Sequence, residues 1–176
     1  QLPFAWNTGV EQVKQQLSDV LLKATDSKEI KWVVNYQIAT LKRANNQPAV
    51  KGVKNIIAVT SGKGGVGKSS VSVNLALALQ AQGARVGILD ADIYGPSVPH
   101  MLGAPHQRPT SPDNQHITPI KAHGLSANSI GFLMDEDNAT IWRGPMASSA
   151  LSQLLNETLW DSLDYLVIDM PPGTGD

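Results

Sequence analysis

The 176-residue sequence contains no cysteine, which excludes disulfide bonds and cysteine-ligated metal within this chain. Aromatic residues make up only 5%, and no run approaches the roughly eighteen apolar residues of a membrane-spanning helix. Residues 1–25 also lack the basic-then-apolar order of a secretory signal. We therefore expect a soluble, cytoplasmic protein without a membrane partner.

An excess of one charge is lacking as well. Fourteen Lys and Arg residues stand against fifteen Asp and Glu residues, for a formal net charge of -1, and neither sign is gathered into a run. We therefore expect no nucleic-acid partner. The 41% of hydrophobic residues is enough for a globular core and argues against a disordered chain.

The first part of the chain predicts one helix and one strand. Residues 8–25 carry apolar side chains at three- and four-residue steps, which is typical of an amphipathic helix, and Thr8 and Glu11 have the spacing of a capping box. Residues 30–38 alternate in the manner of a strand. The residues predicted on its apolar face are Trp32, Val34, Tyr36 and Ile38.

These few elements are too small for a core of their own. We interpret residues 1–46 as the C-terminal part of a small α+β N-terminal domain, followed by a linker over residues 47–54. The alternative is an appendage packed on the main domain. We expect residues 55–176 to form that main domain and the chain to end inside it.

From residue 55 onward, short apolar strands alternate with helices, which predicts an α/β fold with a mostly parallel sheet and flanking helices. The predicted strands are Ile56–Thr60, Val86–Asp90, Leu125–Ile130 and Tyr165–Met170. Helices are predicted from about Gly67 to Gln82 and from about Met146 to Leu159. The second helix has Leu151, Leu154, Leu155 and Leu159 on one face, and residues 103–119 read as a surface loop with a turn at Asp113-Asn114.

The segment SGKGGVGKSS, residues 61–70, matches the phosphate-binding pattern G-x-x-x-x-G-K-S between a predicted strand and a predicted helix. Backbone N–H groups of such a loop surround phosphates, while Lys68 neutralises them and the Ser69 hydroxyl binds Mg²⁺. The predicted nucleotide-binding residues are Gly62, Lys63, Gly64, Gly65, Val66, Gly67, Lys68, Ser69 and Ser70. The alternative is a glycine-rich turn that binds nothing.

Carboxylates follow two of the predicted strands. Asp90 and Asp92 end the second strand, where one could support Mg²⁺ and the other orient the attacking water, or either could cap a turn. Asp169 ends a hydrophobic strand in the manner of a Walker B motif and is predicted to hold Mg²⁺. The N–H of Gly173, just beyond it, is a candidate switch contact to the γ-phosphate.

Other polar residues are less informative. The four histidines lack paired ligand spacing, so surface positions are the default over a metal site. Trp142 and Arg143 could contact a partner or nucleotide, although a core tryptophan and an ion-paired arginine fit equally well.

The second lysine of the loop, Lys63, resembles the deviant Walker A pattern of the MinD, ParA and nitrogenase-reductase group. In that group this lysine reaches across a homodimer to the partner's nucleotide, so the resemblance implies a dimer in which Lys63, Lys68, Asp90 and Asp92 serve catalysis. The alternative is a solvated loop lysine.

Further segments make the resemblance more specific. The segments LDADIYGPSVPHMLG, NSIGFL, WRGPMASSAL and DYLVIDMPPGTGD are similar, in order and spacing, to the Mrp/ApbC family of iron–sulfur cluster carrier ATPases. The resemblance implies an ATP- and Mg²⁺-dependent P-loop NTPase that carries a 4Fe–4S cluster between two subunits and delivers it to apo-proteins.

The chain departs from that family in one respect. The family's cluster is held by a Cys-x-x-Cys pair beyond the switch segment, and this chain has no cysteine and stops at Asp176. We therefore expect a fragment that cannot hold a cluster and whose ATP hydrolysis is impaired. The alternatives are a MinD/ParA-like ATPase that switches between partners without a cluster, and a regulatory module that binds ATP without turnover.

Overall fold

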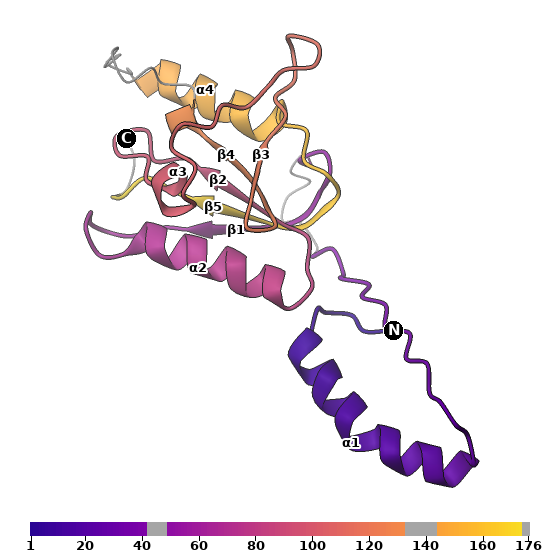
Figure 1. Ribbon diagram of the computed structural model, residues 1–176. Helices are drawn as coiled ribbons and strands as arrows, with labels where there is room; N and C mark the ends of the chain where they lie inside the picture. Colours follow the sequence, from indigo (N-terminus) through magenta and orange to yellow (C-terminus); the bar gives the residue numbers. More distant parts are fainter. Residues whose placement is uncertain (42–48, 133–143, 174–176) are drawn as a thin grey trace.

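The computed structural model describes residues 1–41, 49–132 and 144–173, and its centre is a five-stranded sheet (Figure 1). The strands are ordered β1 (Val53–Val59), β5 (Leu163–Asp169), β2 (Val86–Asp90), β4 (Leu125–Ser129) and β3 (Ile120–Ala122). The first four are parallel, and β3 pairs antiparallel with β4. The predicted α/β class with a mostly parallel sheet is confirmed.

Helices cover both faces of this sheet, with α2 (Lys68–Ala81) on one side and α4 (Gly144–Asn156) on the other (Figure 1). The core is accordingly split in two. Successive strand residues point to opposite faces, so Ile88 joins the cluster under α2 whereas Leu89 joins the cluster under α4. Strands buried on both faces are usually apolar, and β2 and β5 show this in their sequences. The strand β4 is also buried throughout but carries Ser126, Asn128 and Ser129.

The predicted elements differ from the observed ones mainly at their ends. Strand β1 begins three residues before the predicted Ile56, and α4 ends at Asn156 rather than at Leu159. The prediction for Leu159 is wrong: its side chain is 41% exposed, because the chain leaves the helix and the Leu159 N–H donates to the Ile117 carbonyl at 2.9 Å.

Sequence reasoning missed three short elements, α3 (Val98–Met101), the 3-10 turn η1 (Ile130–Phe132) and β3. β3 and β4 form a hairpin whose two-residue turn, His123-Gly124, has φ angles of 49° and 79°. A two-residue hairpin turn of this kind requires two positive φ angles. The His123-Gly124 pair was the feature of the sequence from which the hairpin could have been predicted. The predicted turn at Asp113-Asn114 is confirmed, since Asn114 has φ 61°.

The N-terminal helix α1 (Asn7–Thr25) projects away from the sheet, and its first turn lies against the C-terminal end of α2 (Figure 1). The predicted capping box is wrong: Trp6 is the N-cap residue, and the Thr8 hydroxyl instead donates to Oε1 of Gln82 at 3.0 Å. The Asn7 N–H donates to the Gln82 carbonyl at 3.1 Å, so α1 is attached to the end of α2. Within the described ranges, no helix has the length and apolar character needed to cross a membrane.

The strand predicted over residues 30–38 is not formed, although its alternation is real. The residues on the predicted apolar face are at least partly buried, and Val33 between them is 72% exposed. A strand needs a partner backbone, and among the described residues this segment finds only Leu2, which bonds to Asn35 and Gln37. The apolar stripe of α1 also stays largely open, with Leu17 44% exposed.

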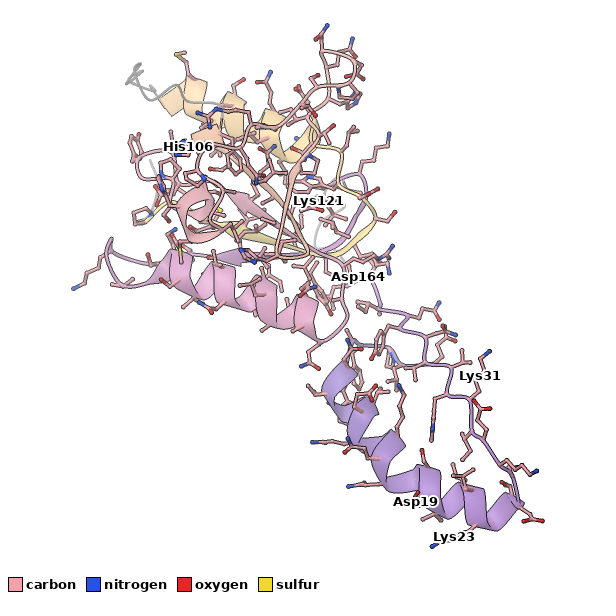
Figure 2. The ribbon with its side chains drawn as sticks, viewed as in Figure 1. Asp19, Lys23, Lys31, His106, Lys121 and Asp164 are labelled. Carbon is pink, nitrogen blue, oxygen red and sulfur yellow. The ribbon has the colours of Figure 1, made fainter. Side chains whose placement is uncertain are left out.

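Asp164 joins three strand ends at the amino-terminal edge of the sheet (Figure 2). It is 6% exposed and accepts hydrogen bonds from Nζ of Lys54 at 2.7 Å and from the Arg85 backbone N–H at 3.0 Å. Burial by itself raises the pKa of this carboxyl, but the hydrogen bonds from Arg85 and Lys54 outweigh burial and lower the pKa below its usual 3.8.

We expect Asp164→Asn to lower the free energy of unfolding by roughly 2 kcal/mol at pH 7, because hydrogen bonds to a charged acceptor are lost. The folded-state pKa lies below the unfolded one, so this stabilisation is full above about pH 4 and disappears as the pH falls through the folded pKa. Urea unfolding between pH 7 and pH 3 measures it. Asp161→Asn, whose side chain is 86% exposed, is the control and should cost little at any pH. An Asp164→Asn deficit that is independent of pH would contradict this account.

Candidate nucleotide-binding site

A pocket of about 340 Å³ opens where three parallel strands end together. Val59, Asp169 and Asp90, at the carboxyl ends of β1, β5 and β2, are paired at the same level of the sheet. Ligands of open α/β sheets bind at this edge. The pocket is lined by Ser61, Gly64, Gly65, Gly67, Lys68, Ser69, Ser70, Asp92, Gly95, Ser97, Met101 and Pro172.

The glycine-rich loop connects β1 to α2 in the strand–loop–helix arrangement that its sequence predicts. Gly65 and Gly67 have φ angles of 74° and 89°, a region that other residues adopt with strain. In the described part of the chain, the N–H groups of Gly64, Gly65, Gly67 and Lys68 donate to no protein acceptor. A Cβ atom added at Gly64, Gly65 or Gly67 would meet nothing within 4 Å. Open space lined by free N–H groups at a helix N-terminus fits an anionic phosphate.

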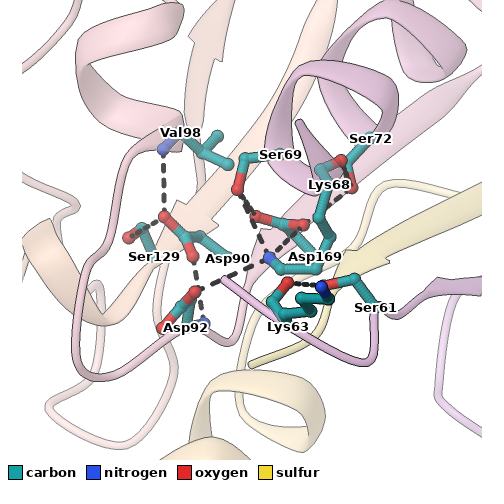
Figure 3. Close-up of polar contacts among 10 residues, drawn as sticks. All are labelled: Ser61, Lys63, Lys68, Ser69, Ser72, Asp90, Asp92, Val98, Ser129 and Asp169. Atoms are coloured by element: carbon teal, nitrogen blue, oxygen red, sulfur yellow. Dashed lines mark hydrogen bonds and ion pairs between the residues drawn. The ribbon is translucent and has the colours of Figure 1, made fainter. Parts of the chain in front are cut away.

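Lys68 lies at the centre of the polar contacts in the site (Figure 3). Its side chain is buried, and Nζ lies 2.6 Å from Oδ1 of Asp169 and 3.6 Å from Oδ2 of Asp92. The Ser69 hydroxyl donates to Oδ2 of Asp169 at 2.5 Å. One cation therefore compensates two carboxylates, and Asp169 is fully buried.

The two carboxylates after β2 occupy different environments. Asp92 faces the pocket, whereas Asp90 is fully buried and accepts the N–H groups of Asp92 and Val98, each at 3.1 Å (Figure 3). The Ser129 hydroxyl adds a third bond to Asp90 at 3.2 Å. Burial raises the pKa of Asp90 from 3.8 to about 6, with the hydrogen bonds from Val98 and Asp92 opposing this. Asp90 thus anchors the loop that carries Asp92.

The remaining predicted residues divide into those on the pocket wall and those outside it. Ser70 lines the pocket, whereas Gly62, Lys63 and Val66 are exposed and do not line it. The N–H of Gly173 donates to the Ser61 carbonyl at 2.8 Å, which places the segment after β5 against the start of the loop. The predictions for Trp142 and Arg143 lie outside the described residues.

Two serines that sequence reasoning missed bond to the buried carboxylates. Ser129 is the last residue of β4 and pairs with Asp90, and Ser72 donates to Oδ1 of Asp169 at 2.8 Å. For Ser72 a signal existed, because it lies four residues after Lys68 and so on the same face of α2. No such indication exists in the sequence for Ser129, because its place beside Asp90 depends on the pairing of β4 with β2.

The oxygen atoms around Lys68 suit a hard divalent cation such as Mg²⁺. The Ser69 hydroxyl and the Asp169 carboxylate are the hard ligands that Mg²⁺ prefers, and they lie beside the phosphate cradle. Within the described ranges, this site included, no group of three or more His, Cys, Asp or Glu side chains is arranged to hold a metal, so protein ligands here are few. A 4Fe–4S cluster does not fit the residues of this chain, because cysteine thiolates are its usual ligands.

Comparisons with known proteins agree with this geometry. A family model described as ParA: NUBPL iron-transfer P-loop NTPase matches residues 52–176. The iron–sulfur cluster carrier protein of Haemophilus influenzae is 91% identical over 176 residues, all of this chain and 48% of that relative. The protein of the same name from Escherichia coli K12 is 66% identical over 175 residues, 99% of this chain and 47% of the relative.

A solved structure is similar as well. A nucleotide-binding protein from Archaeoglobus fulgidus in complex with ADP superposes with a TM-score of 0.62 at 40% identity, over 72% of this chain and 48% of that protein. The chain spans about half the length of the curated relatives it matches.

Proposed function

The chain belongs to the ParA/NUBPL family of iron-transfer P-loop NTPases, and on that basis we propose that it is the nucleotide-binding part of an ATP-dependent iron–sulfur cluster carrier. The proposal places the protein in the cytoplasm, with apo forms of iron–sulfur proteins as its partners. The names of its relatives support the cargo, and the phosphate cradle beside Lys68 supports the nucleotide.

We assign the steps of ATP hydrolysis to residues of the pocket. The N–H groups of the loop and the Lys68 ammonium bind the β- and γ-phosphates, and Ser69 and Asp169 hold Mg²⁺. Mg²⁺ held there would supply positive charge that neutralises the phosphates. Asp92, on the pocket wall, orients the attacking water, with Asp90 keeping its loop in place.

We propose that two copies meet at the pocket and that Lys63 acts on the partner's nucleotide. Lys63 is exposed beside the pocket and forms no ion pair within the described ranges. Apolar side chains are exposed on the same loop, where Val66 is 60% exposed, and on the segment after β2, where Tyr94 is 79% and Met101 40% exposed. A rim of this composition supports an interface between subunits.

The cluster itself requires residues beyond this chain. We propose that the natural protein supplies a cysteine pair from outside residues 1–176, and that residues 1–46 belong to a separate small domain. Both proposals are consistent with relatives about twice as long.

Anaerobic reconstitution with iron and sulfide tests the function directly. We expect the protein at the full length of its gene to retain about four irons and four sulfides per dimer. The 176-residue chain is the matched control and should retain neither, because it lacks cysteine. Stoichiometric iron in the control would contradict the assignment of the ligands. No iron in either, with ATP binding intact, would instead favour the partner-switching ATPase.

A further inference from the structure

Asp169 has three hydrogen-bond donors, and they come from one segment of α2. Oδ1 accepts from Nζ of Lys68 at 2.6 Å and from the hydroxyl of Ser72 at 2.8 Å, whereas Oδ2 accepts from the hydroxyl of Ser69 at 2.5 Å (Figure 3). The carboxylate is fully buried at the end of β5. A buried carboxylate that loses its donors is costly, so these three contacts determine its orientation.

Two of the three donors are the groups that the proposed function assigns to the ligand, and the inference rests on that function. With ATP bound, the Lys68 ammonium would pair with the phosphates instead of Asp169, and the Ser69 oxygen would be available to hold Mg²⁺. Ser72 has no such competing task, because it is fully buried one helical turn behind Lys68 and does not line the pocket. Its alternative acceptor is the Lys68 carbonyl at 3.1 Å, which belongs to the helix and does not move away.

We propose that Ser72 is a positioning residue that holds Asp169 while Lys68 changes partner. Its hydroxyl keeps Oδ1 in place within the sheet–helix interface, so that Oδ2 stays on the Ser69 side, where it would help to hold Mg²⁺. The carboxylate then enters the metal's surroundings already oriented, which avoids the cost of ordering it on binding.

The test is the Mg²⁺ dependence of nucleotide binding in Ser72→Ala. Alanine keeps the helix, since it has the highest helix propensity, and removes only the hydroxyl. With Mg²⁺ present we expect the fluorescent ADP analogue mant-ADP to bind about tenfold more weakly, the effect of one hydrogen bond to a charged group. With EDTA, Ser69 still donates to Oδ2, so the loss should stay within about threefold. Ser72→Cys has nearly the same size and a weaker hydrogen-bond donor. Its affinity for mant-ADP in the presence of Mg²⁺ should therefore lie between those of the unmodified protein and Ser72→Ala.

Ser126→Ala is the control for losing a buried serine, because Ser126 is 4% exposed on β4 and does not line the pocket. We expect it to bind mant-ADP normally in both conditions. If Ser72→Ala weakened mant-ADP binding equally with Mg²⁺ and with EDTA, or not at all, this inference would be overturned and the proposed function would stand. Failure of the unmodified full-length protein to bind mant-ADP would overturn the proposed function, and this inference with it.

Discussion

Lys63→Ala is expected to lower ATP hydrolysis by about a thousandfold while leaving ATP affinity within about twofold. A positive charge supplied across an interface stabilises the transition state of phosphoryl transfer by this order of magnitude. Binding should survive because Lys63 lies outside the pocket wall and the phosphate cradle remains intact. Turnover and mant-ATP titration of the full-length protein measure the two quantities. Lys51→Ala, another exposed lysine, is the matched control.

Subunit mixing tests whether Lys63 acts across the dimer. Lys63→Ala and Lys68→Ala are each expected to be inactive alone. In a mixed dimer, the nucleotide site that retains Lys68 receives Lys63 from the other subunit, so an equal mixture should recover about a quarter of normal turnover. No recovery, with exchange of subunits verified, would place Lys63 in its own subunit's site. Undiminished turnover of Lys63→Ala would remove the lysine from the reaction altogether.

Lys68→Ala is expected to abolish nucleotide binding and also to lower the free energy of unfolding by about 3 kcal/mol in the absence of nucleotide, because a buried carboxylate loses its cation. Asp169 is fully buried and Asp92 is 8% exposed, so neither regains full hydration when the ammonium is removed. Urea unfolding and mant-ADP titration separate the two effects.

The double variant Lys68→Ala/Asp169→Asn distinguishes charge from packing. Removing the uncompensated carboxylate should restore much of the stability without restoring nucleotide binding. Lys68→Ala that is as stable as the unmodified chain would mean that the contact between Lys68 and Asp169 contributes nothing before the ligand binds.

Only part of the candidate site could be predicted from local sequence patterns. The loop from Gly62 to Ser69 was predictable because its spacing, its glycines and its neighbouring strand and helix all lie within one short segment. The pairing of Lys68 with Asp169 was not, since about a hundred residues separate them and only the adjacency of β1 and β5 brings them together. The different roles of Asp90 and Asp92 could not be predicted either. They depend on which carboxylate is buried and which faces the pocket, and the sequence does not show this.

In the N-terminal segment, a local pattern predicted a strand that the structure does not contain. Alternation over residues 30–38 correctly predicted which side chains are at least partly buried, yet no strand formed. Side-chain periodicity reports only which faces are apolar, whereas a strand exists by hydrogen bonds to another backbone.

The sequence by itself determined the class of the fold, the place of the phosphate loop and the absence of cysteine ligands, because each depends on residues close together in the chain or on composition. Tertiary structure alone decided that Asp169 is held by three donors from α2, that Asp90 supports a loop while Asp92 faces the pocket, and that Ser72 belongs to the site. These depend on the order in which β1, β5 and β2 are laid side by side, and that order is a property of long-range packing rather than of any one segment.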